Sequence, residues 1–368
     1  METDEIARKE QLEESEDSPW RQERVELSKK VQELYDAGCP LFTKSQLASF
    51  AEQLAHKSPE FESMDMEGET WCFPVKWDYF QDDETLSINY RPIQRLVIPS
   101  PSDRPDELRN PGCSVDVEPT DLPSRMTPDQ VVMAVGKIGE AFKEYEKTWE
   151  ASPQCQELKD ILKSVLIPNV INKIICFGLG DLVLDSDDDH NDRYCGENSE
   201  DRRHTQHAVA LTLSQILGDL TGRKIRCYAQ DPAYTQASVE YLKSRNIVVL
   251  DDPQGFLDVD EYTLVFSVAP TVPVKQIVTE LARPAIIIWD PEVPDEMDRM
   301  GWEHIRFPDG DEKWISPWCS DPDSARTRKM EKEEYISHPF PDDWFVIYGT
   351  QILIRKASNG KDNAAQCL

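Results

Sequence analysis

The residues best placed to take part in chemistry are Gly178 and Gly180, which follow the apolar run 173–177. In doubly wound α/β folds, a glycine-rich turn after the first strand is where nucleotides bind. A dinucleotide site would require a third glycine at the position of Val183, with the N-terminus of a helix directly behind it. Neither is present, so the spacing disfavours a NAD-type site. Providing a tight turn is the simpler role for the two glycines.

The turn leads into a strongly acidic loop, residues 181–203. Its acidic side chains beyond the turn are Asp185, Asp187, Asp188, Asp189, Asp192, Glu197, Glu200 and Asp201, against Arg193, Arg202 and Arg203. Negative charge at this position repels a diphosphate. The alternating aspartates resemble the start of an EF-hand, but His190 replaces the required glycine and Gly196 stands where the bidentate glutamate belongs. We therefore expect a solvated loop and no metal site.

A ligand without phosphates, such as S-adenosylmethionine, escapes this electrostatic objection. Asp231 follows the second strand, where a carboxylate binds ribose in this topology. Gln206 stands near the start of a helix expected to face the glycine turn. Gly178, Gly180, Gln206 and Asp231 are thus the candidate cofactor-binding crevice. Capping of the turn at Asp231-Pro232 is the favoured alternative role of the aspartate.

Two histidines, His204 and His207, flank Gln206 and are candidates for acid–base chemistry or for half of a metal site. No further metal ligands accompany them, and no serine or cysteine nucleophile stands in an elbow motif nearby. A structural role is favoured for both. The sequence therefore assigns no catalytic residues.

The elements that position these residues alternate between strand and helix. Apolar runs predict strands at 173–177, 224–229, 247–250, 263–266 and 285–289, and helical periodicity predicts helices at 205–220, 235–244 and 274–281. Repeated β-α-β order with short connections predicts an α/β, Rossmann-like, mostly parallel sheet flanked by helices.

N-terminal helices and a C-terminal hairpin are expected to flank this sheet. The first helix starts at Pro19, a second is capped by Thr43, and Thr127 caps a third whose apolar residues repeat at a 3.5-residue spacing. Those repeating residues are Val131, Val135, Ile138, Phe142, Tyr145 and Trp149. Packing in the core is favoured for them over a partner-binding surface. The hairpin pairs 344–348 with 351–356 through a turn at Gly349-Thr350.

Four regions follow from these patterns. Residues 1–18 are expected to be a disordered acidic tail. Residues 19–125 hold N-terminal helices and a Pro-rich connector, with only a possible short strand at 95–98. Residues 126–357 form the Rossmann-like domain with the acidic loop 181–203, and residues 358–368 form a tail.

The formal net charge of −30, from 70 acidic and 40 basic side chains, disfavours binding to nucleic acid or to anionic lipid. Protein partners, some of them basic, are the alternative. The nine cysteines form an odd set without a C-x-x-C pair, which favours a reducing compartment over disulfides or zinc. Because no secretory signal or membrane-spanning run is found, we expect a cytoplasmic and/or nuclear protein.

The order and spacing of several short motifs carry a family resemblance. They are Ile175-Cys-Phe-Gly-Leu-Gly180, Gln206-His-Ala208, Tyr228-Ala-Gln-Asp-Pro232 followed by Tyr234, and Gly255 after a short strand. Over residues 165–290 the chain resembles the Sensitivity to Red Light Reduced family. The acidic loop is an elaboration of the kind expected in a divergent, fungal-type branch.

The resemblance implies a Rossmann-like domain without established catalytic activity. It also implies a regulatory role, linked to light signalling and circadian rhythms in plants and to haem metabolism in animals. The chain departs from the family pattern because Thr271 and Val272 replace the His and Cys of a Pro-His-Cys motif, and Trp289-Asp290-Pro291 replaces Asn-Ser-Phe. We therefore expect a regulatory or adaptor protein. The favoured expectation is that it is not an enzyme and that it binds no cofactor. Two alternatives stay open, an S-adenosylmethionine-binding protein of the methyltransferase type and a haem-associated regulator.

Overall fold

The computed structural model describes residues 19–81, 84–98, 100, 112–123, 125–165, 171–183, 199–307, 312–341 and 349–357. The expected tails, 1–18 and 358–368, lie outside the described residues. So does most of the acidic loop, residues 184–198.

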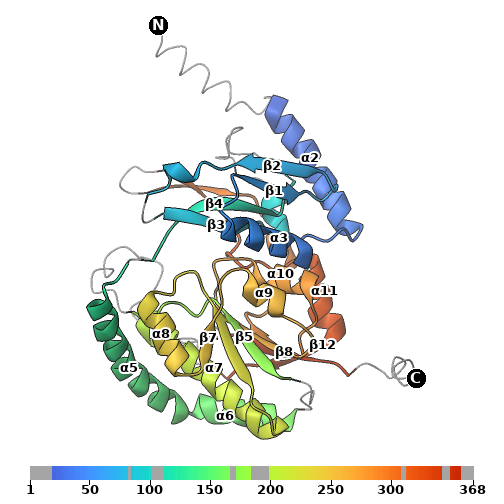
Figure 1. Cartoon of the computed structure of the whole chain (residues 1–368). Helices are drawn as coiled ribbons and strands as arrows, with labels where there is room; N and C mark the ends of the chain where they lie inside the picture. The colour runs from blue at the N-terminus through green and yellow to red at the C-terminus, as the bar shows by residue number, and fades with distance from the viewer. Residues whose placement is uncertain are drawn as a thin grey trace, which may run out of the picture.

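A seven-stranded sheet forms the centre of the fold (Figure 1). Five strands are mutually parallel: β5 (Lys173–Phe177), β6 (Arg226–Gln230), β7 (Ile247–Val249), β8 (Thr263–Ser267) and β9 (Ile286–Trp289). The sheet order is β12-β13-β9-β8-β5-β6-β7. The chain thus runs outwards from β5 to β7 on one side and from β8 to β9 on the other. This arrangement confirms the predicted mostly parallel α/β fold.

Helices cover both faces of the sheet, as the continuous apolar strands require. On β5, Ile174 and Cys176 pack into the core under α5 (Pro128–Glu150), α6 (Pro153–Ser164), α7 (Ser199–Thr221) and α8 (Gln236–Ser244). Ile175 and Phe177 point to the opposite core, under α9 (Gln254–Asp258), α10 (Val274–Leu281) and α11 (Ala325–Glu334). Alternate residues of one strand therefore serve two separate cores.

The helix α5 confirms its predicted start. The Thr127 side chain accepts a hydrogen bond from the backbone N–H of Gln130, and the Gln130 side chain accepts one from the Thr127 backbone. Its stripe packs on α7 and α8, with Phe142 completely buried and 5.3 Å from the Tyr241 ring centre. The stripe is part of the core, as favoured above.

The segment 57–125 differs from the expected connector. It contains β1 (Glu60–Met64), β2 (Thr70–Pro74), the 3-10 helix η1 (Trp77–Tyr79), β3 (Glu84–Tyr90), α4 (Ile93–Val97) and β4 (Val115–Asp121). The hairpin β1–β2 and the pair β3–β4 are antiparallel. The expected strand at 95–98 is wrong: Pro92 precedes a helical turn there, because helix geometry places both Ile93 and Leu96 in the core.

This N-terminal layer packs on the sheet together with α2 (Pro19–Asp36) and α3 (Lys44–Ala55), whose predicted starts are confirmed (Figure 1). Phe256 of α9 joins the layers, since its ring lies 5.5 Å from that of Tyr90 and 4.6 Å from that of Phe177. The Lys44 ammonium donates to the carbonyls of Leu257 and Val259. The N-terminal elements are therefore docked on the α/β core.

The C-terminal region corrects one further expectation. The strand predicted at 351–356 is confirmed as β13 (Gln351–Arg355), but its hairpin partner is β12 (Tyr335–Pro339), and 344–348 lie outside the described residues. The strand β13 lies between β9 and β12, so its apolar side chains are buried. Between β9 and α11 the chain forms the 3-10 helix η2 (Asp295–Arg299) and the hairpin β10 (Glu303–Arg306) with β11 (Glu312–Ile315).

Candidate functional site

The space beside the glycine turn after β5 is filled by other residues of the protein. Gly178 and Gly180 have positive φ angles of 70° and 77°. A Cβ atom at Gly178 would lie 2.7 Å from the Cα of Pro270, and one at Gly180 would lie 2.7 Å from the Cδ of Arg203. Both glycines are thus required by backbone conformation and by a close approach. The groups that approach them belong to this protein.

Asp231 is engaged in the same turn. Its Oδ2 atom accepts a hydrogen bond of 2.7 Å from the backbone N–H of Gly180, and its Oδ1 atom accepts one of 2.9 Å from the N–H of Ala233. Burial raises the pKa of this carboxyl, and the two hydrogen bonds oppose the rise. The bond from Ala233 is the local turn contact that the capping interpretation predicts, and the bond from Gly180 joins the end of β5 to the end of β6.

The neighbouring Asp181 anchors the loop to α8. Its Oδ1 atom accepts a hydrogen bond of 2.8 Å from the backbone N–H of Thr235, the N-cap of that helix. Its Oδ2 atom accepts one of 3.0 Å from the N–H of Val183. The first acidic residue of the loop thus has a structural partner.

The two histidines are buried within α7. The Nδ1–H of His207 donates to the carbonyl of Arg203 at 2.7 Å, so its Nε2 accepts from the hydroxyl of Tyr234 at 2.8 Å. Burial lowers the pKa of His207 to about 4, so the ring is neutral at physiological pH. The ring of His204 lies 5.0 Å from that of Tyr145. Gln206 lies beside them and is also buried.

The predicted residues are therefore brought together only in part. Gly180 and Asp231 share a hydrogen bond, and Gly178 lies at the point where the strand order reverses between β5 and β8. Gln206 lies on α7, one turn from Arg203, whose side chain covers Gly180. Whether a ligand binds at this edge stays a prediction.

Sequence reasoning missed a polar network at the ends of β6 and β7. The Gln230 Oε1 accepts from the backbone N–H of Gly255 at 2.6 Å, and its Nε2 donates to Asp252 at 2.8 Å. The same Asp252 oxygen accepts from the hydroxyl of Tyr90 on β3 at 2.8 Å. Burial raises the pKa of Asp252 to about 6. This network ties the N-terminal layer to the carboxyl edge of the sheet.

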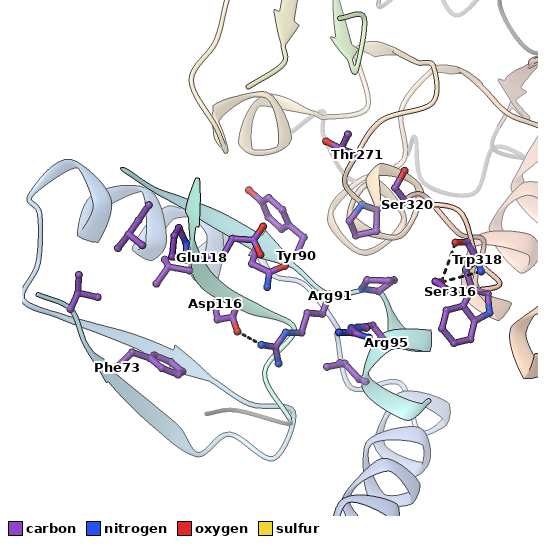
Figure 2. A pocket seen from close by; sticks show the side chains of 18 of the residues that line it. Phe73, Tyr90, Arg91, Arg95, Asp116, Glu118, Thr271, Ser316, Trp318 and Ser320 are labelled. Carbon is purple, nitrogen blue, oxygen red and sulfur yellow. Dashed lines mark hydrogen bonds and ion pairs between the residues drawn. The ribbon is translucent and has the colours of Figure 1, made fainter. Parts of the chain in front are cut away.

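A cavity of about 1230 Å³ opens where the N-terminal layer meets the C-terminal loops (Figure 2). Its walls come from the end of β2, from β3 and β4, from α4, from the loop after β8 and from residues 316–320. Tyr90 lines it and connects it to the network around Asp252. Thr271, which replaces the histidine that the family resemblance expects, also lines it. Because β3 and β4 were not predicted from the sequence, this cavity was not among the candidate sites of the sequence analysis.

Two charged side chains that line the cavity, Arg91 and Asp116, are paired with each other. Arg91 forms an ion pair with Asp116, and Figure 2 shows both side chains beneath Tyr90 and Glu118. Burial raises the pKa of Asp116 to about 6 while the Arg91 guanidinium opposes the rise. Asp116 Oδ1 has no hydrogen-bond partner among the described residues. The wall of the cavity thus contains a buried acid with one oxygen that is unsatisfied among the described residues.

Metal chemistry receives no support from the described part of the chain. No group of three or more His, Cys, Asp or Glu side chains is arranged there to hold a metal ion. Nor is any helix within these ranges sufficiently long and apolar to cross a bilayer.

The fold and the glycine turn define the class of protein: an α/β protein with a Rossmann-like domain. Residues 158–310 match the model of the SRR1 domain, so this part of the chain is similar to that domain. The match includes β5 to β9 and both candidate glycines. Comparison with curated proteins and with solved structures finds no significant match.

Proposed function

We propose that this protein, which carries the region similar to the SRR1 domain, is a regulatory or adaptor protein that acts by binding and not by catalysis. The observation that carries the proposal is the state of the glycine turn. Pro270 and Arg203 lie on the two glycines, and Asp231 uses both carboxylate oxygens for backbone N–H groups. A nucleotide at this edge would have to displace these contacts. His207 supports the same conclusion, because both of its ring nitrogens are already engaged, one by the Arg203 carbonyl and one by the Tyr234 hydroxyl.

Protein partners suit the charge of the molecule. A net charge of −30 favours association with basic surfaces, and the rate of such association falls as salt is added. The family resemblance suggests a part in light or circadian signalling, or in the regulation of haem metabolism. A cytoplasmic or nuclear location completes this proposal.

The alternative function is that of an adenosine-binding protein of the methyltransferase type. It requires the Asp231 carboxylate to exchange its two backbone hydrogen bonds for ribose hydroxyls. No metal or further cofactor enters either function.

Thermal denaturation of the purified protein with S-adenosylmethionine, S-adenosylhomocysteine or adenosine separates the two. The regulatory proposal expects an unchanged Tm. A ligand at a hundred times its Kd would add about 2.7 kcal/mol and raise Tm by several degrees. A rise that Asp231→Asn abolishes would overturn the proposal in favour of the adenosine site.

A spectral titration with haemin tests the haem link. A Soret band that shifts and saturates at one haemin per protein would replace the adaptor proposal by haem sensing.

A further inference from the structure

The cavity between the N-terminal layer and the C-terminal loops lies next to the sheet edge at which doubly wound folds bind ligands. Pro270, in the loop after β8, lies against Gly178 at the switch point between β5 and β8. The next residue, Thr271, lines the cavity, and so does Pro273. The loop after β8 therefore fills the space at the glycine turn with one residue and opens onto the cavity with the following ones.

The charged side chains of the lining have contacts within the protein. They are Arg24, Lys76, Arg91, Arg95, Asp116 and Glu118. Arg91 is paired with Asp116, and its guanidinium also opposes the rise that burial causes in the pKa of Glu118. The Arg95 guanidinium lies 4.7 Å from the ring centre of Trp302, and Arg24 has a partner as well. Lys76 and Glu118 are both exposed and have opposite signs. A charged group of a ligand would have to compete with these contacts.

Two tryptophans supply a rigid aromatic part of the wall. The indole N–H of Trp302 donates to the carbonyl of Ile98 at 3.0 Å, and that of Trp318 donates to the carbonyl of Met297 at 2.8 Å. The two ring centres lie 6.0 Å apart, with the rings nearly perpendicular at 87°. Because both rings are held by hydrogen bonds, a flat ligand stacks on the half-buried Trp318 without first having to order it.

The remaining lining is mostly aliphatic or aromatic, with few uncharged polar groups. Leu27, Phe73, Val75, Phe80 and Leu96 contribute apolar surface. Among the hydroxyls, that of Ser320 donates to the carbonyl of Pro270, and that of Ser316 donates to the carbonyl of Trp318. Thr271 is exposed at the cavity, where its hydroxyl can donate or accept a hydrogen bond. Figure 2 shows Thr271 and Trp318 on the side of the C-terminal loops, with Tyr90 and Arg91 on the side of the N-terminal layer.

We infer that this cavity binds a flat, uncharged organic molecule whose apolar body stacks on Trp318 and whose polar group faces Thr271. A volume of about 1230 Å³ accommodates such a molecule with water around it. A mostly apolar lining with a few polar groups is typical of small-molecule sites. The inference goes beyond the proposed function, because it adds a small ligand to a protein that acts by binding. It rests on that proposal only for its biological meaning.

The test uses two fluorescent probes of similar shape with the full-length protein. One is N-phenyl-1-naphthylamine, which is neutral, and the other is 8-anilinonaphthalene-1-sulfonate, which carries a sulfonate on the same ring system. We expect the neutral probe to bind saturably at one per chain and at least as tightly as the anion. Added sodium chloride should not weaken the neutral probe, because its binding involves no ion pair that salt could screen.

Two variants locate the site, each with a matched control. Trp318→Ala should weaken binding of the neutral probe about two- to tenfold, because it removes the stacking surface. Trp314→Ala makes the same change on β11, outside the cavity lining and at a ring that is 39% exposed, and should leave the affinity unchanged. Thr271→Trp places a bulky ring in the cavity and should also weaken binding. Thr70→Trp adds the same ring at an exposed position outside the lining and should have no effect. Circular dichroism melts verify that each variant is folded.

Tighter binding of the anion than of the neutral probe would overturn the inference, as would equal losses in Trp318→Ala and Trp314→Ala. Binding that Thr271→Trp leaves unchanged would place the probe elsewhere and would also overturn it. Adenosine is itself flat and uncharged, but the two sites respond to different variants. A rise in Tm that Asp231→Asn abolishes belongs to the glycine turn, whereas one that Thr271→Trp alone abolishes belongs to this cavity. Failure here and failure of the adaptor proposal are thus distinguishable.

Discussion

The ammonium of Lys275 lies 3.1 Å from the carboxylate of Asp323, and both side chains are almost fully buried. Lys275 is in the first turn of α10, and Asp323 precedes α11. Asp323 also accepts a hydrogen bond of 2.6 Å from the backbone N–H of Val293. The pair therefore joins three segments that follow β8 and β9. Gln276, next in the chain, accepts from the N–H of Ile93 at 2.9 Å and thereby connects α4 to this joint.

Removing the cation should destabilise the fold strongly. Lys275→Met leaves the buried carboxylate of Asp323 without its counter-charge, and breaking a buried pair costs about 3–5 kcal/mol. Urea denaturation measures this free energy of unfolding. Lys243→Met, at an exposed position of α8, is the control and should change it by less than about 0.5 kcal/mol. A loss below about 1 kcal/mol in Lys275→Met would contradict the role of this pair.

Buried carboxyls near this pair should make stability depend on pH. Burial raises the pKa of Asp321 to about 8 and that of Glu331 to about 7, both far above their unfolded values. The folded state thus binds more protons between about pH 4 and pH 8, and these groups lose their stabilising contribution as pH rises through that window. Each such group contributes a slope of up to about 1.4 kcal/mol per pH unit.

Asp321→Asn isolates one of these contributions. The variant cannot take up the proton, so its free energy of unfolding should fall less steeply between pH 5 and pH 7 than that of the unmodified protein. Urea titrations at several pH values measure both slopes. Parallel slopes would show that Asp321 is ionised in the folded protein throughout this range.

The close approach of Pro270 to Gly178 predicts that alanine is less well tolerated at position 178 than at another glycine with a positive φ, Gly222. Gly178→Ala meets both a positive φ and the backbone of Pro270, whereas Gly222→Ala meets only a positive φ of 66°, with nothing within 4 Å of the new methyl. The left-handed conformation costs about 1–2 kcal/mol in either variant. Crowding adds about 1–3 kcal/mol at position 178 alone. Thermal melts of the two proteins compare them directly, and equal Tm values would mean that Pro270 moves aside.

The α5 helix offers a test of its core assignment. Phe142→Ala removes a completely buried ring and should cost about 3–5 kcal/mol. Val132→Ala, on the same helix but 72% exposed, should cost less than about 0.5 kcal/mol. The two variants are compared by chemical denaturation. If both variants lost less than about 0.5 kcal/mol of unfolding free energy, the core assignment would be wrong and the apolar stripe would be better explained as a partner-binding surface.

The part of the chain most accurately predicted is the parallel sheet with its helices. Continuous apolar runs such as Ile174–Phe177 form buried strands in any packing that satisfies their backbone, and local signals such as the Thr127 capping box start helices without help from distant residues. The strands β3 and β4 were not predicted, because they carry neither a continuous apolar run nor a local signal that marks them. They are half-buried, and Tyr90 pairs with Val115 across a long insertion, so no local pattern marks the pairing.

The sequence by itself determined the Rossmann-like core, the two glycines of its first turn and the acidic charge, because these depend on residue type and near neighbours. Only the tertiary structure decided what lies on those glycines and where a cavity opens. Pro270 and Asp231 reach the turn from two different loops and Arg203 reaches it from α7, and Arg91 meets Asp116 only when β3 pairs with β4. Contacts between residues far apart in the chain are set by the packing of whole layers, which local periodicity does not encode.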